Sequence, residues 1–259
     1  MRQPIIAGNW KMHKTVREAI DLVNGLKRNF IDEMEMDIVV CPPYTVLSEV
    51  EEVIRDSQIK LGAQDMHWED KGAFTGEISP LMLKDLGVEY VIIGHSERRQ
   101  FFGETNETVN RKVKSALKYK LIPIVCVGET LEERKRGETF EVVKDHLENG
   151  LGGIEVQEPS DLVIAYEPVW AIGTGINATA SQAEEVHSYI RDFLNKIFGK
   201  DIAEGIRIQY GGSVKPDNIE DLIREKDVDG ALVGGASLDL VSFTEIIKKS
   251  QAINQLKGA

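Results

Sequence analysis

The sequence predicts an α/β fold of a single domain over residues 1–259, a (β/α)₈ barrel with a parallel eight-stranded sheet. Short apolar runs rich in β-branched residues alternate with amphipathic helical segments from one end of the chain to the other. The 259 residues leave about 32 for each of eight βα units, which is enough for a strand, a helix and their loops. No linker, low-complexity segment or shift in composition divides the chain.

The expected strands are near-continuous apolar runs, which are typical of a sheet covered on both faces. In chain order they cover residues 5–7, 37–41, 59–63, 90–93, 121–127, 162–166, 206–209 and 229–233. The amphipathic segments predict helices over residues 16–30, 46–55, 108–119, 140–147, 183–198, 219–224 and 243–249. Thr15, Ser79 and Ser181 are of the residue types that cap helices, and we expect each to mark a helix start.

Composition and charge limit the partners. The net charge of −12 argues against nucleic acid or an anionic membrane as a partner. No apolar run approaches membrane-spanning length, and the N-terminus lacks the pattern of a secretory signal, so a cytoplasmic protein is expected. Cys41 and Cys126, the two cysteines, lie in or beside apolar runs and are expected to be inert core thiols. The histidines show no metal-binding spacing, so no metal site is expected.

The segment after the sixth predicted strand combines a carboxylate with an apolar loop. Glu167 stands at the C-terminal end of the strand, Pro168 ends the strand, and residues 169–172 are apolar. Gly173 and Gly175 supply backbone freedom for a hinge. A carboxylate beside a flap that can close over it suits proton abstraction away from water. Taken alone, Glu167 has the simpler alternative of a solvated residue at a strand end.

The same segment also matches the dinucleotide-binding pattern G-x-G-x-x-G/A at Gly173, Gly175 and Ala178. Pro168 and several further residues separate the strand from the first glycine, whereas that pattern needs a tight turn from strand to helix. We therefore expect no nucleotide cofactor. A nucleotide-dependent oxidoreductase is therefore the function that the sequence supports least.

Other polar residues and glycines follow the predicted strands, and in a barrel these positions meet at the C-terminal mouth, where the chemistry of this fold takes place. Individually they have ordinary alternatives: an exposed lysine, a core histidine, a solvated charge run, and tight turns. Their shared place at strand C-termini favours one site. Glycine-rich turns after the last two strands can hold an anion through backbone N–H groups. The candidates are Asn9, Lys11, His95, Glu97, Glu167, Ser213, Gly234 and Gly235.

Six segments covering essentially the whole chain, in order, carry a resemblance to a known family. They are GNWKM at 8–12, GHSERR at 94–99, CVGET at 126–130, AYEPVWAIGTG at 165–175, YGGSV at 210–214 and VGGASL at 233–238. Together they resemble the triosephosphate isomerase family, whose members are TIM barrels. The chain departs from the family pattern at His13, Ala180 and residues 176–177, none of which lies at the proposed chemistry.

The resemblance implies interconversion of dihydroxyacetone phosphate and D-glyceraldehyde 3-phosphate without a cofactor. It implies that Glu167 is the base, that His95 is a neutral electrophile, and that Ser96 holds the base while the lid is open. It also implies that Asn9 and Lys11 stabilise substrate charge, and that Glu97 is an acid that acts without touching the substrate. The implied backbone donors to the phosphate lie at Gly173, Ser213, Gly234 and Gly235.

Residues 64–77 form a long segment without periodicity, which within a compact domain suggests a functional loop. Met66, Trp68 and Phe74 would be poorly placed in water, which argues against a disordered excursion. The resemblance implies a homodimer in which Thr75 reaches the neighbouring subunit's site. The alternative function is a phosphosugar-binding barrel without activity. Binding alone needs no base, so the presence of Asn9, Lys11, His95 and Glu167 together favours the isomerase.

Overall fold

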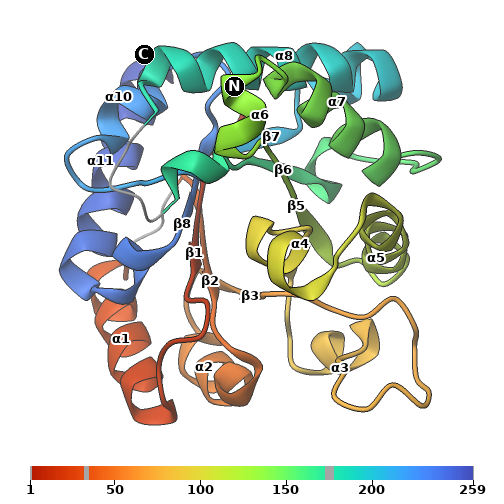
Figure 1. The fold of residues 1–259 in the computed structure, drawn as a ribbon. Coiled ribbons are helices and arrows are strands. Elements are labelled where there is room, and N and C mark those ends of the chain that lie inside the picture. The colour runs from red at the N-terminus through yellow and green to blue at the C-terminus, as the bar shows by residue number, and fades with distance from the viewer. Residues whose placement is uncertain (1, 32–34, 173–177, 259) are drawn as a thin grey trace.

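Eight parallel strands close into a barrel in the order β1 to β8, with β1 hydrogen-bonded to β8 (Figure 1). The predicted (β/α)₈ fold is thereby confirmed. The computed structural model describes residues 2–31, 35–172 and 178–258. The strands are β1 (Ile5–Asn9), β2 (Asp37–Cys41), β3 (Ile59–Ala63), β4 (Tyr90–Ile93), β5 (Ile122–Val127), β6 (Val163–Tyr166), β7 (Arg207–Tyr210) and β8 (Gly230–Val233).

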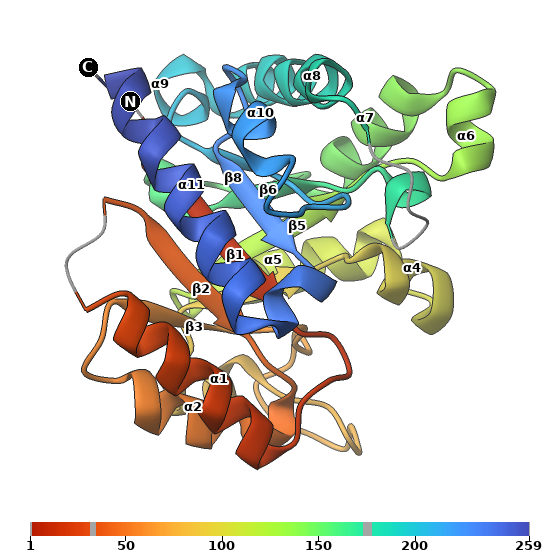
Figure 2. The same cartoon turned by 90° about the vertical axis from the view of Figure 1, so that its left-hand side faces the viewer.

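Helices surround the barrel; α11 lies across the outer face of β1 and β8, between α1 and α10 (Figure 2). The helices are α1 (Val16–Asn29), α2 (Leu47–Ile54), α3 (Pro80–Asp85), α4 (Ser96–Phe102), α5 (Asn106–Lys118), α6 (Leu131–Lys135), α7 (Thr139–Gly150), α8 (Ala180–Phe198), α9 (Lys200–Ala203), α10 (Ile219–Arg224) and α11 (Leu240–Gly258). None of these described helices is long and apolar enough to cross a membrane.

Helix starts follow capping chemistry, with one correction to the sequence analysis. Thr15 precedes α1, and the Ser79 side chain accepts a hydrogen bond from Met82 N at the start of α3, both as predicted. Ser181, however, lies inside α8, which begins after Thr179. The Thr179 side chain accepts from Gln182 N, and the Gln182 amide oxygen accepts from Thr179 N. This reciprocal pair satisfies two backbone donors at once, whereas Glu184, which could pair with Ser181 in the same way, accepts from Asp227 N.

Inward-facing strand residues fill the barrel with a packed core rather than a channel, as the period-two alternation of strands requires. Cys41 and Cys126 are both buried there and unpaired, as expected. Burial raises the pKa of the Cys41 thiol to about 12, so it carries no charge at neutral pH. At the N-terminal end, Arg207 pairs with Asp37, and Tyr90 Oη donates to Asp37 at 2.7 Å. The barrel is therefore closed at its base by satisfied polar groups, and a ligand would enter from the opposite end.

Candidate active site

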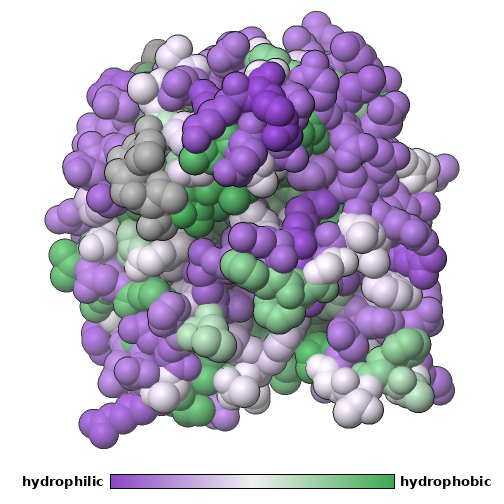
Figure 3. Space-filling model, in the orientation of Figure 1, coloured by the Kyte–Doolittle hydropathy of each residue, from purple (hydrophilic) through white to green (hydrophobic). Residues whose placement is uncertain are grey.

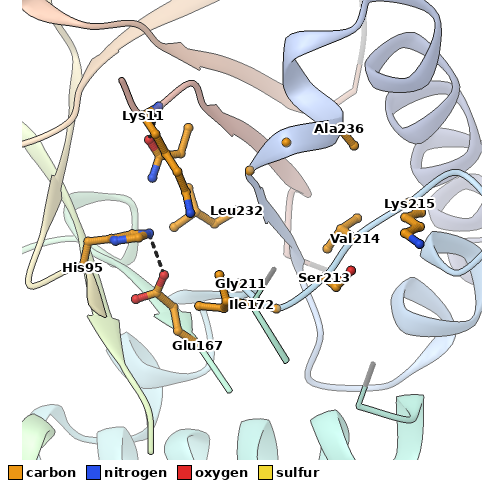
Figure 4. A pocket seen from close by; sticks show the side chains of 14 residues that line it. Lys11, His95, Glu167, Ile172, Gly211, Ser213, Val214, Lys215, Leu232 and Ala236 are labelled. Atoms are coloured by element: carbon orange, nitrogen blue, oxygen red, sulfur yellow. Dashed lines mark hydrogen bonds and ion pairs between the residues drawn. The ribbon is translucent and has the colours of Figure 1, made fainter. Parts of the chain in front are cut away.

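A cavity of about 400 Å³ opens at the C-terminal mouth of the barrel. Lys11, His95 and Glu167 converge on one side of it, and Ser213 faces them from the other (Figure 4). The sequence-predicted residues that line it are Asn9, Lys11, His95, Glu167, Ser213, Gly234 and Gly235. Glu97 does not line the cavity but contacts Lys11. Gly173, together with the Gly173–Gly175 part of the dinucleotide pattern, lies outside the described residues.

The end of β1 is shaped to present a lysine. Lys11 has a positive φ of 52°, a conformation that side chains other than glycine adopt rarely. Asn9 Oδ1 accepts from Lys11 N at 3.0 Å, and Gln64 Nε2 donates to Lys11 O at 2.8 Å. The ammonium lies 2.5 Å from Glu97 Oε1. The strained turn therefore fixes Lys11 across the mouth, and Gln64, a residue that the sequence analysis gave no role, holds it there.

His95 stands at the N-cap of α4, directly after β4. Its Nδ1 accepts a hydrogen bond from Glu97 N at 3.2 Å, so the proton of the neutral ring is on Nε2. Nε2 lies 2.9 Å from Glu167 Oε1. The ring thus presents an N–H group toward the cavity, which is the group needed to polarise a substrate carbonyl.

Glu167 is almost completely buried at 2% exposure, at the end of β6. Its Oε2 accepts from Ser96 N at 2.9 Å, while Oε1 faces His95 Nε2. Burial raises the pKa of Glu167, but His95 and the Ser96 N–H outweigh it, so the net pKa lies below the ordinary value. The Glu167 carboxylate is therefore ionised at neutral pH while it is bound to Ser96 N and faces His95 Nε2.

The charge state of His95 depends on where Glu167 points. Burial lowers the pKa of His95 and the Glu167 carboxylate raises it, with a net upward direction while the two are in contact. A second ring proton would have to sit on Nδ1, against the N–H of Glu97 that already donates there. Once Glu167 turns to a substrate, burial, the Lys11 charge and the Glu97 N–H favour the neutral ring, and the Glu97 carboxylate opposes them.

Two glycines make room for the base. A Cβ added at Gly211 would lie 2.9 Å from Glu167 Cγ, and one added at Gly128 would lie 1.9 Å from Glu167 O. Neither contact is possible for a larger residue without displacing Glu167. The apolar side chains of Ile172 and Leu232, which the sequence analysis did not assign to the site, complete the cavity wall near the carboxylate.

The turn after β8 orients backbone donors. Ser237 N and Ser237 Oγ both donate to Gly234 O, at 2.8 and 2.7 Å. The N–H of Gly235 belongs to the same trans peptide as that carbonyl and therefore points the opposite way. A Cβ added at Gly234 would lie 3.6 Å from Lys11 Cε, so the lysine stem runs over this turn. An anion held here would meet the Gly235 N–H and the Lys11 charge.

The start of the apolar flap is anchored to a buried carboxylate. Glu129 is fully buried, and its oxygens accept from Trp170 Nε1 at 2.8 Å and Tyr166 Oη at 3.1 Å. Arg134 Nη1 donates to it at 3.1 Å, and the guanidinium lies 4.4 Å from the Trp170 ring centre. Glu129 was noted in the sequence only as part of a motif, and no local signal revealed that it holds the flap.

Comparisons with known proteins agree with this geometry. The family model described as triosephosphate isomerase matches residues 4–250. The chain belongs to the triosephosphate isomerase family. A triosephosphate isomerase of Carboxydothermus hydrogenoformans is 57% identical over 250 residues, covering 96% of this chain and all of the relative. One of Alkaliphilus oremlandii is 56% identical, covering 95% and 99%. A crystal structure of the Bartonella henselae enzyme has a TM-score of 0.87 at 39% identity, covering 95% of this chain and 98% of that one.

In triosephosphate isomerases a neutral histidine at a helix N-terminus and a glutamate base are the established pattern, and a loop closes over the site. In this chain His95 stands at the N-cap of α4, and Glu167 follows β6. The resemblance to the family stated from the sequence is confirmed by the family model and the relatives. Within the described ranges no group of three or more potential metal ligands is assembled.

Proposed function

We propose that this chain interconverts dihydroxyacetone phosphate and D-glyceraldehyde 3-phosphate through an enediolate, with Glu167 as the base. The observation that carries the proposal is the pairing of an ionised, buried carboxylate with a ring N–H, 2.9 Å apart, in the wall of the cavity that Lys11 overhangs. Neither group would be needed at such a place for binding alone.

The proton moves between two adjacent carbons. Glu167 removes a proton from C1 of dihydroxyacetone phosphate, and the electron pair of that C–H bond forms the C1–C2 double bond as charge moves to the carbonyl oxygen. His95 Nε2–H donates to that oxygen, and the Lys11 ammonium stabilises the negative charge. The carboxylic acid of Glu167 then returns a proton to C2, while the proton of the C1 hydroxyl passes through His95 to the C2 oxygen, so that C1 becomes the aldehyde and C2 carries the hydroxyl.

The structure corresponds to a withdrawn base. Glu167 is bound to Ser96 N and His95, so it must rotate to reach a substrate carbon. Closure of the flap that starts at residues 169–172 would exclude water around the carboxylate. Exclusion of water strengthens the electrostatic contacts to the enediolate and protects an intermediate that can lose phosphate.

We further propose that the protein is a homodimer joined through residues 64–77. The base of this loop is packed: Met66 is 1% exposed, and Asp65 pairs with Lys112 at 2.6 Å and Arg98 at 2.8 Å. Phe74, near its tip, is 44% exposed. Apolar side chains also lie over α4 on the same face (Figure 3). An ordered loop that presents an aromatic residue to solvent is suited to a partner subunit.

A cytoplasmic location is part of this proposal, supported by the two buried, unpaired thiols.

The activity is tested by ³¹P NMR of dihydroxyacetone phosphate with the purified protein and no added cofactor. We expect the D-glyceraldehyde 3-phosphate signal to grow to an equilibrium that is also reached from the other side. Binding of either phosphosugar without interconversion would instead support the inactive phosphosugar-binding barrel.

A further inference from the structure

The backbone on both sides of Glu167 is hydrogen-bonded to residues 127–129, which are the last residue of β5 and the two residues after it. Val127 O accepts from Glu167 N at 2.8 Å, and Glu129 O accepts from Val169 N at 3.1 Å. The backbone on both sides of the base is thus tied to the 127–129 segment. The position of the carboxylate depends on where that segment lies.

Gly128, between these two bonds, is in direct backbone contact with the base. A Cβ added at Gly128 would lie 1.9 Å from Glu167 O and 2.6 Å from Glu167 C. No side chain separates the two segments, so a displacement of Gly128 is passed on to Glu167 with nothing to absorb it. What holds Gly128 from behind therefore helps to set the geometry of the base.

The group behind Gly128 is His146, in the third turn of α7. Gly128 N donates to His146 Nδ1 at 3.3 Å. Because Nδ1 accepts, the neutral ring carries its proton on Nε2. Burial, together with the Arg99 charge, lowers the pKa of His146 to about 4, so the acceptor is available throughout the neutral range. His146 does not line the substrate cavity.

His146 is not required to pack α7. The helix is fixed to the barrel by Val143 and Leu147, which are fully buried, whereas the His146 side chain is only half-buried. The contact with Gly128 is thus a specific polar contact on a helix that is already anchored by apolar packing. Such a contact restrains the neighbouring loop at little cost to the fold.

We propose that His146 is a positioning residue for the isomerisation: by accepting the Gly128 N–H it holds the 127–129 segment, and with it Glu167, in the place from which the carboxylate reaches the substrate. The inference rests on the proposed role of Glu167. It is a role for turnover rather than for affinity, because Ser213, a proposed phosphate donor, faces Glu167 from the other side of the cavity (Figure 4).

The test compares His146→Leu, which removes the acceptor, with His146→Asn, whose Oδ1 lies as many bonds from Cβ as Nδ1 and can replace it. Lys144→Leu, on the exposed face of the same helix, is the matched control. We expect kcat of His146→Leu to fall by about 3- to 30-fold with KM within about twofold, since small misplacement of a reacting group costs rate. His146→Asn should recover most of the loss, and Lys144→Leu should match the wild type.

Wild-type kcat in His146→Leu, or an equal loss in His146→Asn, would overturn the inference, as would a change confined to KM. Absence of turnover in the wild-type protein would instead contradict the proposed function, so the two failures are distinct. A measurement on the wild type covers the case in which His146→Leu does not fold. The ¹⁵N chemical shifts of the His146 ring should show a protonated Nε2 and an unprotonated Nδ1, and a proton on Nδ1 would exclude the hydrogen bond with Gly128.

Discussion

Glu167 shows how a buried carboxylate stays charged and still becomes a strong base. Burial alone would raise its pKa, but the ring of His95 and the N–H of Ser96 hold the pKa below the ordinary value. Both partners belong to the withdrawn position. When the side chain turns to the substrate it leaves the Ser96 N–H, so its pKa rises and its affinity for a carbon-bound proton increases. The contacts that keep the base ionised are therefore the ones that it gives up to act.

Replacement of Glu167 by glutamine tests that role. The amide has nearly the same shape but cannot accept the proton, so we expect kcat to fall by about 10²- to 10⁴-fold with little change in KM. Steady-state kinetics in both directions measure this. Glu148→Gln, an exposed substitution on α7, should leave kcat unchanged. A Glu167→Gln variant with wild-type turnover would remove Glu167 from the mechanism.

Gly211 supplies a second test at this scale. A Cβ at residue 211 would come within 2.9 Å of Glu167 Cγ and push the carboxylate aside. We expect Gly211→Ala to lower kcat by about 10- to 100-fold, since a misplacement near 1 Å has effects of this size. Gly150→Ala is the control, because its added Cβ would meet nothing closer than 3.4 Å. Equal activity of the two variants would show that the base has more room than the structure gives it.

Among the elements, the start of the apolar flap is held by one buried carboxylate, Glu129. Trp170→Phe removes the N–H that donates to Glu129 and leaves that acceptor less satisfied in the interior. We expect the free energy of unfolding to fall by about 1–3 kcal/mol, the usual worth of a hydrogen bond to a charged group. Chemical denaturation at fixed protein concentration measures it. An unchanged stability would mean that the indole N–H is not held by Glu129 in solution.

The strands and the strand-end residues were predictable because each depends on local sequence. The apolar runs from β1 to β8 and the polar residues that follow them can be recognised without knowing their neighbours in space. Gln64 and Glu129 could not be assigned, since their partners Lys11 and Trp170 lie 53 and 41 residues away. The start of α8 was misplaced because two capping patterns overlap: Thr179 pairs with Gln182, whereas Glu184, three residues after Ser181, accepts from Asp227 N.

At the scale of the whole molecule, two histidines with lowered pKa values, the half-buried His146 and the buried His187, make stability depend on pH. Burial lowers the pKa of both His146 and His187 to about 4, from an ordinary value near 6.5. The unfolded chain binds more protons between these values, so stability is complete above about pH 6.5 and falls as the pH drops toward 4. The slope should reach up to about 1.4 kcal/mol per pH unit for each histidine.

Urea unfolding at pH 7, 6 and 5 measures that slope. His187→Gln should be less stable than the wild type at pH 7 but should lose less on acidification, because one of the two groups no longer titrates. His13→Gln, at an exposed position, serves as the control and should follow the wild-type slope. Identical pH dependence in His187→Gln and the wild type would contradict a neutral, buried His187.

The proposed dimer has a direct test in the loop of residues 64–77. Phe74→Glu places a charge at the exposed aromatic near its tip, where burial against a partner would cost several kcal/mol. We expect the wild type to sediment as a dimer and the variant as a folded monomer with reduced turnover. Lys71→Glu, an exposed charge change in the same loop, provides a comparison for charge alone. An unchanged sedimentation coefficient for Phe74→Glu would remove Phe74 from the interface.

Isomerisation in ²H₂O tests the central claim most directly, because a proton held on a glutamic acid exchanges with solvent and a hydride passed between carbons does not. With wild-type protein, we expect ¹H NMR to show deuterium at C2 of the D-glyceraldehyde 3-phosphate formed, and Glu167→Gln should form almost no product. Rapid formation of product that carries no deuterium would contradict proton transfer through an enediolate.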